Sequence, residues 1–192
     1  MINYLTKDET YKIANEIIFV SIKSVDDISK FTFDSEIKEY NDFLSVAKFF
    51  DESNISKTFL LIHQKTNELL AYMTLSADSI RLTKDEKEIH NLVKVPYAAV
   101  PALKIGKLAV NRCVSTAVKR KGYGSFMISI ASAFVKKMNE VGVACRFLTV
   151  DADIDYDKNT PEFYVKNGFV VNLNNKSRNP QHSISMRKDV FV

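Results

Sequence analysis

The chain has 192 residues, of which 46% are hydrophobic and 26% are charged, and its formal net charge at pH 7 is +4. This composition is ordinary for a globular protein with one core, and it excludes a largely disordered chain. No apolar run approaches the length of a membrane-spanning helix, and the first nine residues lack the cationic stretch and apolar core of a leader peptide. We therefore expect a cytoplasmic protein that makes no membrane contact.

The first half of the chain predicts a strand, a helix and a hairpin. Residues 16–22 form an apolar run typical of a strand, and residues 35–50 carry apolar side chains at helical spacing. Two further apolar runs, 58–62 and 69–80, flank the polar turn 64–68. Runs of this kind on either side of a short polar turn predict an antiparallel hairpin.

The second half predicts a short helix and then a long strand that leads into a basic loop. A charged helix is expected over residues 84–92. Pro96 and Pro101 bracket an extended connection into the apolar strand 103–110. No repeat, low-complexity tract or linker interrupts the sequence, which predicts one mixed α/β domain.

The basic loop leads into the best-supported helix of the chain. After Gly124, apolar residues recur at helical spacing as far as Met138, and Gly142 is expected to end the helix. Residues 144–150 then form a second, mostly apolar strand. A strand, a crossover helix and a strand in this order predict a parallel pair with a right-handed connection.

The loop segment 119–124, Lys-Arg-Lys-Gly-Tyr-Gly, has the character of an anion-binding turn. Gly122 and Gly124 let the backbone approach a ligand closely, and the helix that follows adds N-terminal donors and the positive end of its dipole. A pyrophosphate fits these features. The alternative interpretation is an ordinary loop that enters a helix.

Cysteines and histidines give no sign of a metal or catalytic cluster. Cys113 and Cys145 are isolated from each other and from histidines, which predicts free thiols and no metal site. His63, His90 and His182 are scattered over predicted strand, helix and strand-edge positions. None of them forms a catalytic pattern alone.

Two motifs occur in a characteristic order. The segment Lys119-x-x-Gly122-x-Gly124 follows the first strand, and residues 163–169, Phe-Tyr-Val-Lys-Asn-Gly-Phe, follow the second. This arrangement resembles the GNAT superfamily of acetyl-CoA-dependent N-acetyltransferases. Five earlier segments are similar to a compact bacterial subgroup of this superfamily, which includes toxins that acetylate the amino group of aminoacyl-tRNA. The segments are 33–36, 41–44, 72–77, 100–103 and 106–110. The whole resemblance spans residues 31–169.

The sequence departs from the family pattern at a few positions. Lys119 stands where the family usually has Arg or Gln, and Ser35-Glu36 replaces a small residue and a glycine. Asn111 follows the strand where the subgroup often has Asp. Lys119 still attracts phosphate, although as a point charge without the fork of an arginine.

The resemblance implies the GNAT fold, a single domain over residues 1–192 with a mixed, mostly antiparallel twisted sheet, a central splayed parallel strand pair and flanking helices. It implies acetyl-CoA as co-substrate and no metal. The pantetheine arm would pair with the strand backbone like an added strand. The implied cofactor-binding residues are Leu108, Ala109 and Val110 for pantetheine, and Lys119, Arg120, Lys121, Gly122, Tyr123, Gly124 and Ser125 for the pyrophosphate.

Acetyl transfer to an amine also needs a proton for the departing thiolate. By resemblance, Tyr164 is the general acid, because a phenol of pKa about 10 can protonate a thiolate whose conjugate acid lies near 8.5. The alternative for Tyr164 is a core aromatic beside Phe163 on the last helix, which Gly168 is expected to cap. A backbone N–H within residues 108–110 is expected to stabilise the oxyanion. No general base is assigned; the candidates, each equally explained as a surface group, are Asp78, Glu88, His90 and Asp151.

Three functions stay open at this point. The first is an N-acetyltransferase in which a primary amine of a small molecule or peptide attacks the thioester directly. The second is a toxin that acetylates aminoacyl-tRNA, with tRNA and an antitoxin as partners, and the third is a CoA-binding interaction protein without turnover. Basic residues concentrate in the cofactor half, but CoA phosphates explain part of this charge. A homodimer is also left open.

Overall fold

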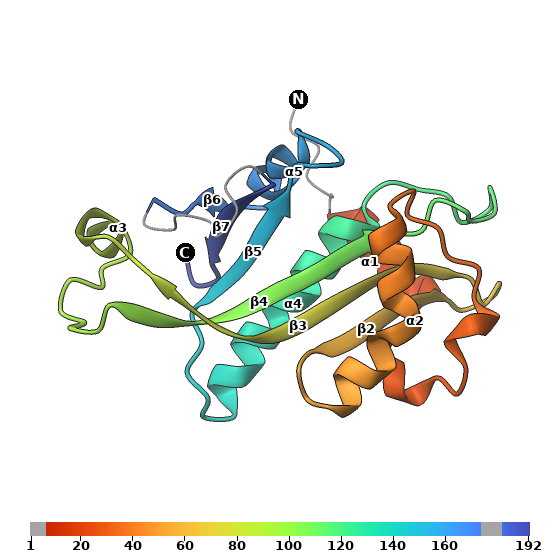
Figure 1. The fold of residues 1–192 in the computed structure, drawn as a ribbon, viewed down its shortest axis with the longest axis horizontal. Coiled ribbons are helices and arrows are strands. Elements are labelled where there is room, and N and C mark those ends of the chain that lie inside the picture. The colour runs from red at the N-terminus through yellow and green to blue at the C-terminus, as the bar shows by residue number, and fades with distance from the viewer. Residues whose placement is uncertain (1–6, 174–181) are drawn as a thin grey trace. The chain divides into compact units, whose positions relative to one another are not determined.

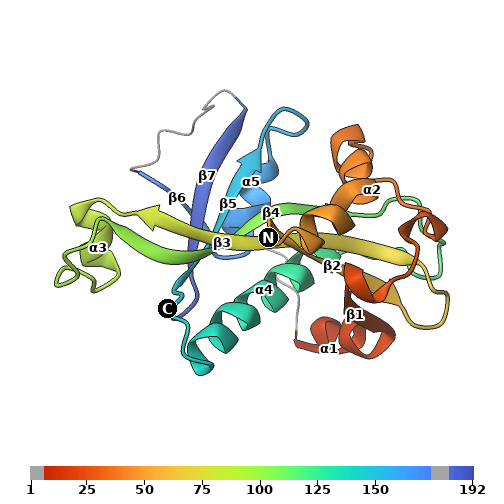
Figure 2. The same cartoon turned by 60° about the horizontal axis from the view of Figure 1, so that its bottom comes forward.

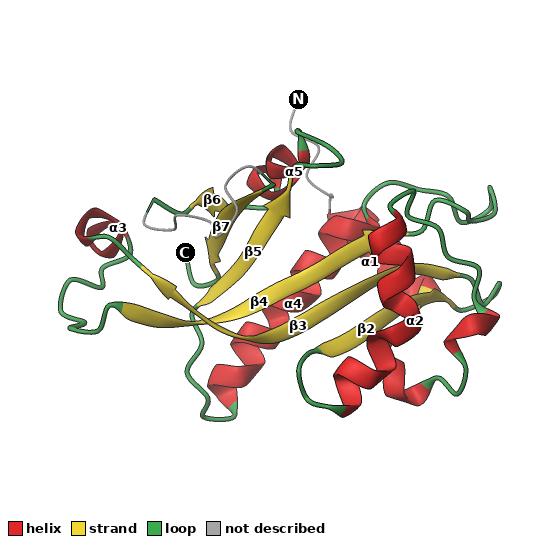
Figure 3. Ribbon diagram, viewed as in Figure 1, coloured by secondary structure: helices red, strands yellow, loops and turns green. Residues whose placement is uncertain are grey.

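The computed structural model describes residues 7–173 and 182–192. Its strands form one seven-stranded sheet in the order β1-β2-β3-β4-β5-β7-β6 (Figure 1, Figure 3). Among the described helices, none combines the length and hydrophobicity that a bilayer crossing requires. The helices are α1 (Lys7–Glu16), α2 (Lys38–Glu52), α3 (Lys84–Ile89), α4 (Tyr123–Glu140) and α5 (Thr160–Lys166), and the strands are β1 (Ile17–Ser21), β2 (Lys57–His63), β3 (Leu69–Arg81), β4 (Ala99–Val110), β5 (Phe147–Asp153), β6 (Val170–Val171) and β7 (Ser183–Asp189).

Packing divides the chain into two compact units. The first contains Ala77–Ile105 and Ile130–Val192, and the second contains Leu5–Ser76 and Gly106–Ser129. Strands β3 and β4 and helix α4 therefore each contribute residues to both units. The basic loop belongs to the second unit, whereas Tyr164 belongs to the first.

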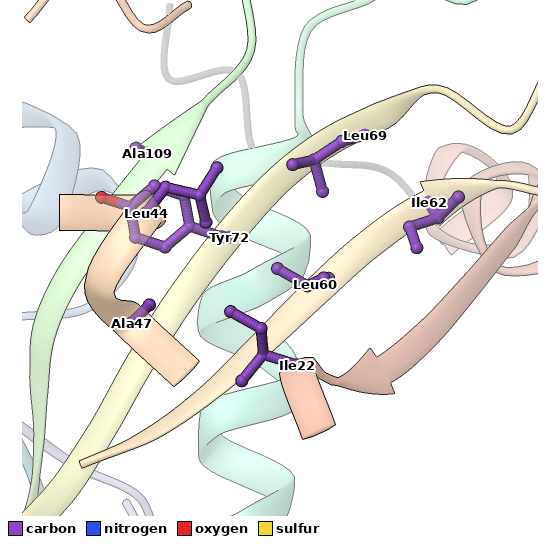
Figure 4. Packing of buried hydrophobic residues seen from close by; sticks show 8 residues of the cluster. All are labelled: Ile22, Leu44, Ala47, Leu60, Ile62, Leu69, Tyr72 and Ala109. Atoms are coloured by element: carbon purple, nitrogen blue, oxygen red, sulfur yellow. The ribbon is translucent and has the colours of Figure 1, made fainter. Parts of the chain in front are cut away.

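The second unit contains the predicted hairpin and the helix before it. Strand β2 pairs antiparallel with both β1 and β3, which confirms the hairpin. Helix α1 lies beside β1, the next element along the chain (Figure 2). Apolar side chains of α2, of the strands and of the turn after β1 share one buried cluster, whose removal from water stabilises the unit. Its members are Ile22, Leu44, Ala47, Leu60, Ile62, Leu69, Tyr72 and Ala109 (Figure 4).

The first unit contains the parallel pair that the sequence predicts. Strands β4 and β5 pair in parallel from Ala102 with Phe147 to Ile105 with Val150. Strand β5 then pairs antiparallel with β7, which lies next to it in Figure 1, and β7 with β6. The mixed α/β class and the parallel pair in a mostly antiparallel sheet are thereby confirmed.

Several boundaries differ from the prediction. Strand β4 begins at Ala99, so Pro101 lies inside the strand. The carbonyl of Pro101 accepts a hydrogen bond from the N–H of Arg146 at 3.2 Å, just before the paired part of β5 begins. Because proline has no N–H and Pro101 precedes the paired residues, the ladder loses no hydrogen bond there. Strand β5 runs over Phe147–Asp153 instead of the predicted residues 144–150. Helix α1 and strands β6 and β7 were not predicted.

Candidate functional site

The end of β4 is a regular strand segment. Ala109 packs into the core cluster of the second unit (Figure 4), while Leu108 and Val110 on either side of it are half-buried. The next residue, Asn111, donates its N–H to the carbonyl of Leu70 at 2.8 Å. The predicted pantetheine segment is therefore held in place by the core cluster of the second unit.

Asn111 joins the end of β4 to the loops around it. Its Nδ2 donates to the carbonyls of Thr32 at 2.8 Å and Leu69 at 2.7 Å. Its Oδ1 accepts from the N–H groups of Asp34 at 3.0 Å and Cys113 at 2.9 Å. An ionised aspartate has no donor for the two carbonyls. The departure from the family pattern at this position is thus explained by structure.

Two contacts fix the basic loop from outside. The N–H and hydroxyl of Ser115 donate to the Glu68 carboxylate at 2.7 and 2.8 Å, and Arg120 forms an ion pair with Glu16 of α1. The backbone hydrogen bond from Ser115 is the largest influence that holds the pKa of Glu68 below its ordinary value. The guanidinium of Arg120, a predicted cofactor-binding residue, is therefore directed to Glu16.

The junction of the loop and α4 has the geometry of an anion site. Gly122 has φ +106°, a conformation that favours glycine, and its carbonyl accepts the N–H of Phe126 at 2.9 Å. The N–H groups of Tyr123, Gly124 and Ser125 precede this first bond of the helix and have no acceptor within it. They point out of the N-terminus of an 18-residue helix, where the dipole favours an anion.

The side chains of this segment divide into two kinds. Tyr123 is buried and donates its hydroxyl to the carbonyl of Val118 at 2.8 Å, so it closes the loop on itself. Burial raises the pKa of the Tyr123 phenol, and the neighbouring Arg120 opposes this. Lys119 and Lys121 are exposed and contribute positive charge. The structure brings these predicted residues together in the second unit with the end of β4.

Tyr164 lies on α5 in the first unit, with 7% of its surface exposed. Its ring contacts Phe163 and Phe169 edge-on, with centroids 5.1 and 5.3 Å apart. Gly168 has φ +86° and ends the helix. Its N–H donates to the carbonyl of Val165, and the N–H of Phe169 donates to the carbonyl of Tyr164, as in a Schellman motif. The predicted cap is confirmed. The aromatic contacts of Tyr164 fit both interpretations of it.

Two of the candidate bases contact side chains of other strands. The hydroxyl of Thr149 donates to Asp78, and the ammonium of Lys104 lies 2.7 Å from Asp151. Both carboxylates are reachable by solvent. Glu88 is exposed on α3. These three stay candidates without a distinguishing contact.

His90 is part of a buried network rather than a surface group. Its Nε2 lies 3.4 Å from Nε of Arg187, which can only donate, so Nδ1 carries the proton and donates to Asp189 at 2.9 Å. Burial lowers the pKa of His90, although Asp189 opposes this, and Arg187 lowers it further. Both ring nitrogens are therefore occupied, which does not suit a general base.

The two cysteines lie apart from any cluster of metal-ligating side chains among the described residues. Cys113 is exposed and Cys145 is buried, and both are free, as predicted. Within residues 7–173 and 182–192, no three His, Cys, Asp or Glu side chains gather as metal ligands would.

The loop's partners were missed by the sequence analysis. Glu16 lies 104 residues before Arg120, and Glu68 lies 47 residues before Ser115. Neither acidic residue occurs in a motif, so no local signal announces the contact. The contact of the Lys107 side chain with α2 was not predicted either.

No protein-family model and no curated protein matches the sequence. Solved structures do match, over most of the chain. A tyrosine-to-phenylalanine mutant of KacT has a TM-score of 0.66 at 22% identity, over 91% of this chain and 95% of that one.

Two further matches carry ligands. AtaTR bound with acetyl-CoA has a TM-score of 0.66 at 20% identity, over 92% and 95% of the two chains. AtaT complexed with acetyl-methionyl-tRNAfMet has a TM-score of 0.64 at 19% identity, over 88% and 94%. The chain thus shares its fold with these proteins, and the fold that the sequence resemblance implied is confirmed.

Proposed function

We propose that this protein is an acetyl-CoA-dependent N-acetyltransferase. The geometry at the start of α4 carries the proposal, because Gly122 turns the backbone so that the first-turn N–H groups face outward beside Lys119 and Lys121. The same fold holds acetyl-CoA in AtaTR. A pyrophosphate at this helix and a pantetheine arm along Leu108–Val110 follow from the proposal.

The chemistry proposed is direct attack of a neutral primary amine on the thioester. The N–C bond forms, an oxyanion develops, and the C–S bond then breaks. A backbone N–H of the Leu108–Val110 segment would stabilise the oxyanion, and the Tyr164 hydroxyl would protonate the CoA thiolate. The proton lost by the amine goes to a base not yet assigned, or to water.

The proposed acceptor is the amino group of an aminoacyl-tRNA. The observation that favours it over a small amine is the structure of AtaT with acetyl-methionyl-tRNAfMet, on a fold that this chain shares over most of its length. AtaT also occurs bound to the C-terminus of the antitoxin AtaR, so we propose an antitoxin as the second partner. The net charge of +4 is compatible with a polyanionic acceptor.

The test is a thiol-release assay with acetyl-CoA against charged tRNA, peptides and small amines. We expect release with charged tRNA, and a rate that falls steeply with added salt because phosphate contacts release counterions. Release that depends only on small amines and is insensitive to salt contradicts the tRNA proposal. Acetyl-CoA binding without release toward any acceptor contradicts the enzyme and favours a CoA-binding interaction protein.

Gly124→Glu tests the cofactor position in the same experiment. The added carboxylate lies at the N-terminus of α4 and should abolish acetyl-CoA binding in calorimetry, because it occupies the space of a phosphate with like charge. Ser129→Glu adds the same charge on an exposed position of the same helix and should bind as the parent does. Equal binding by Gly124→Glu and the parent shows that the site is elsewhere.

A further inference from the structure

Lys107 is held more firmly than a surface lysine. It lies on β4, one residue before the proposed pantetheine segment, and 19% of its side chain is exposed. Its Nζ is 2.6 Å from the carboxylate of Glu39, 4.7 Å from the ring centroid of Tyr40 and 5.3 Å from that of Phe43. A half-buried ammonium between a carboxylate and two aromatic faces is a stronger contact than an exposed ion pair.

The backbone of Lys107 is fixed as well. Its N–H donates to Oγ1 of Thr74 at 2.8 Å, and Thr74 is buried on β3. A Cβ atom built on the preceding Gly106 lies 2.8 Å from the same oxygen. Strand β4 therefore approaches the Thr74 hydroxyl at a distance that only glycine allows, directly before the segment Leu108–Val110.

The helix that receives the Lys107 ammonium is itself anchored. The Tyr72 hydroxyl donates to the carbonyl of Tyr40 at 2.8 Å, and the rings of Tyr72 and Phe43 stack with centroids 6.3 Å apart. Tyr72 belongs to the core cluster of the second unit (Figure 4). Two partners of Lys107, Tyr40 and Phe43, thus pack against the core cluster of the second unit, so the Lys107 side chain links β4 to that core.

We propose that Lys107 is a positioning residue for acetyl-CoA. It sets the direction of the N–H and C=O groups of Leu108–Val110 by fixing the strand through Thr74 on one side and α2 on the other. A pantetheine arm bound as an added strand depends on that direction, whereas a pyrophosphate at the N-terminus of α4 does not. This inference rests on the proposed cofactor site and adds the residue that aligns it.

The difference between the two halves of the ligand gives the test. Binding of acetyl-CoA and of ADP, which keeps a pyrophosphate but lacks pantetheine, is measured by calorimetry for the parent and for Lys107→Met. We expect acetyl-CoA affinity to fall about tenfold, the scale of a partly buried cation–π contact with its ion pair, while ADP affinity stays the same. Lys107→Arg should recover most of the loss, because it keeps the cation.

Two further variants keep the result interpretable. Glu39→Gln, at an exposed carboxylate, should weaken acetyl-CoA in the same selective way but less. Lys38→Met removes the neighbouring exposed Lys38–Asp42 pair of the same helix and should change neither ligand. An equal loss for acetyl-CoA and ADP, or no loss for either, overturns the positioning role. A parent protein that binds no acetyl-CoA overturns the proposed function instead, and this inference with it.

Discussion

Two arginine–glutamate ion pairs, one buried and one partly exposed, differ in what they contribute to the molecule. In the first unit, Arg187 and Glu86 lie 2.6 Å apart with side chains 4% and 1% exposed. In the second unit, Arg120 and Glu16 are 30% and 41% exposed. The first pair joins β7 to α3, and the second joins the basic loop to α1.

The surroundings of the two pairs differ accordingly. Arg187 Nη1 also donates to Asn172 Oδ1 at 3.1 Å and to the Val171 carbonyl at 3.2 Å. Burial tends to raise the pKa of Glu86, but the N–H groups of Thr83 and Leu173, together with Arg187, hold it below its ordinary value. The polar groups of this network thus bind one another, and the network stabilises the fold. The Arg120 pair shares its charges with water and holds the loop that leads into α4.

The largest effect on activity should come from a first-unit residue outside the ionic network. Tyr164→Phe keeps the ring and its aromatic contacts, so the fold and acetyl-CoA affinity should persist. Turnover should fall about 100-fold to 10,000-fold, the usual contribution of a general acid. Single-turnover rates measure this, and an acyl donor with a better leaving thiol should narrow the loss. A variant with the parent's rate when chemistry is limiting returns Tyr164 to a core role.

The largest effect on stability should come from Arg187. Arg187→Met leaves the Glu86 carboxylate buried without its cation, which costs about 3–5 kcal/mol of unfolding free energy. Urea unfolding followed by circular dichroism measures the loss. The double variant Glu86→Leu with Arg187→Met should recover part of it, since neither charge is then left alone, while the N–H groups of Thr83 and Leu173 lose their acceptor. A single variant as stable as the parent shows that the pair is not a closed network.

The pH dependence of stability sharpens the same contrast. The folded-state pKa of His90 lies below its unfolded value of about 6.5, so below that pH the unfolded chain binds more protons than the folded one. Stability should therefore be complete above pH 6.5 and fall as the pH drops toward the folded pKa. Urea midpoints between pH 7.5 and 5 measure the slope. His90→Gln should flatten it, and an unchanged slope places the titration elsewhere.

The smallest effect should come from the exposed pair. Arg120→Met should cost at most about 1 kcal/mol of unfolding free energy, because water screens both partners. The same urea experiment compares it directly with Arg187→Met. Acetyl-CoA affinity should change little, since the proposed contact uses backbone N–H groups. A loss as large as that of Arg187→Met contradicts the comparison.

Local patterns were sufficient for the part of the fold that carries the proposed cofactor site. The apolar run of β4, the helical spacing of α4 and the glycines before it are all visible within a short stretch of sequence. The cap at Gly168 was predicted for the same reason. The hairpin of β2 and β3 followed from its polar turn.

Elements that depend on distant partners were not predictable. Strand β7 carries Arg187 in its buried stretch, and the acid that makes this burial possible, Glu86, lies 101 residues away. Its sequence alternates polar and apolar residues only as far as Met186, which is too short a run to predict a strand. Helix α1 has a single buried apolar residue, Ile13, among its residues from Lys12 onward, too little for a periodic signal. The acceptor side of the candidate site could not be predicted for a similar reason. The role of a carboxylate such as Asp78 depends on the residues that surround it in the fold, and the local sequence does not show them.

Glu36 adopts a backbone conformation that suits glycine better than a residue with a side chain. It has φ +65° in the position where the GNAT subgroup carries glycine, and there a side chain costs about 1–2 kcal/mol. Its N–H donates to Asp34 Oδ1 at 2.8 Å, and its carboxylate lies 3.0 Å from Arg112. These contacts offset part of the strain. The left-handed conformation at residue 36 is therefore a property of the backbone path and not of the residue type that occupies it.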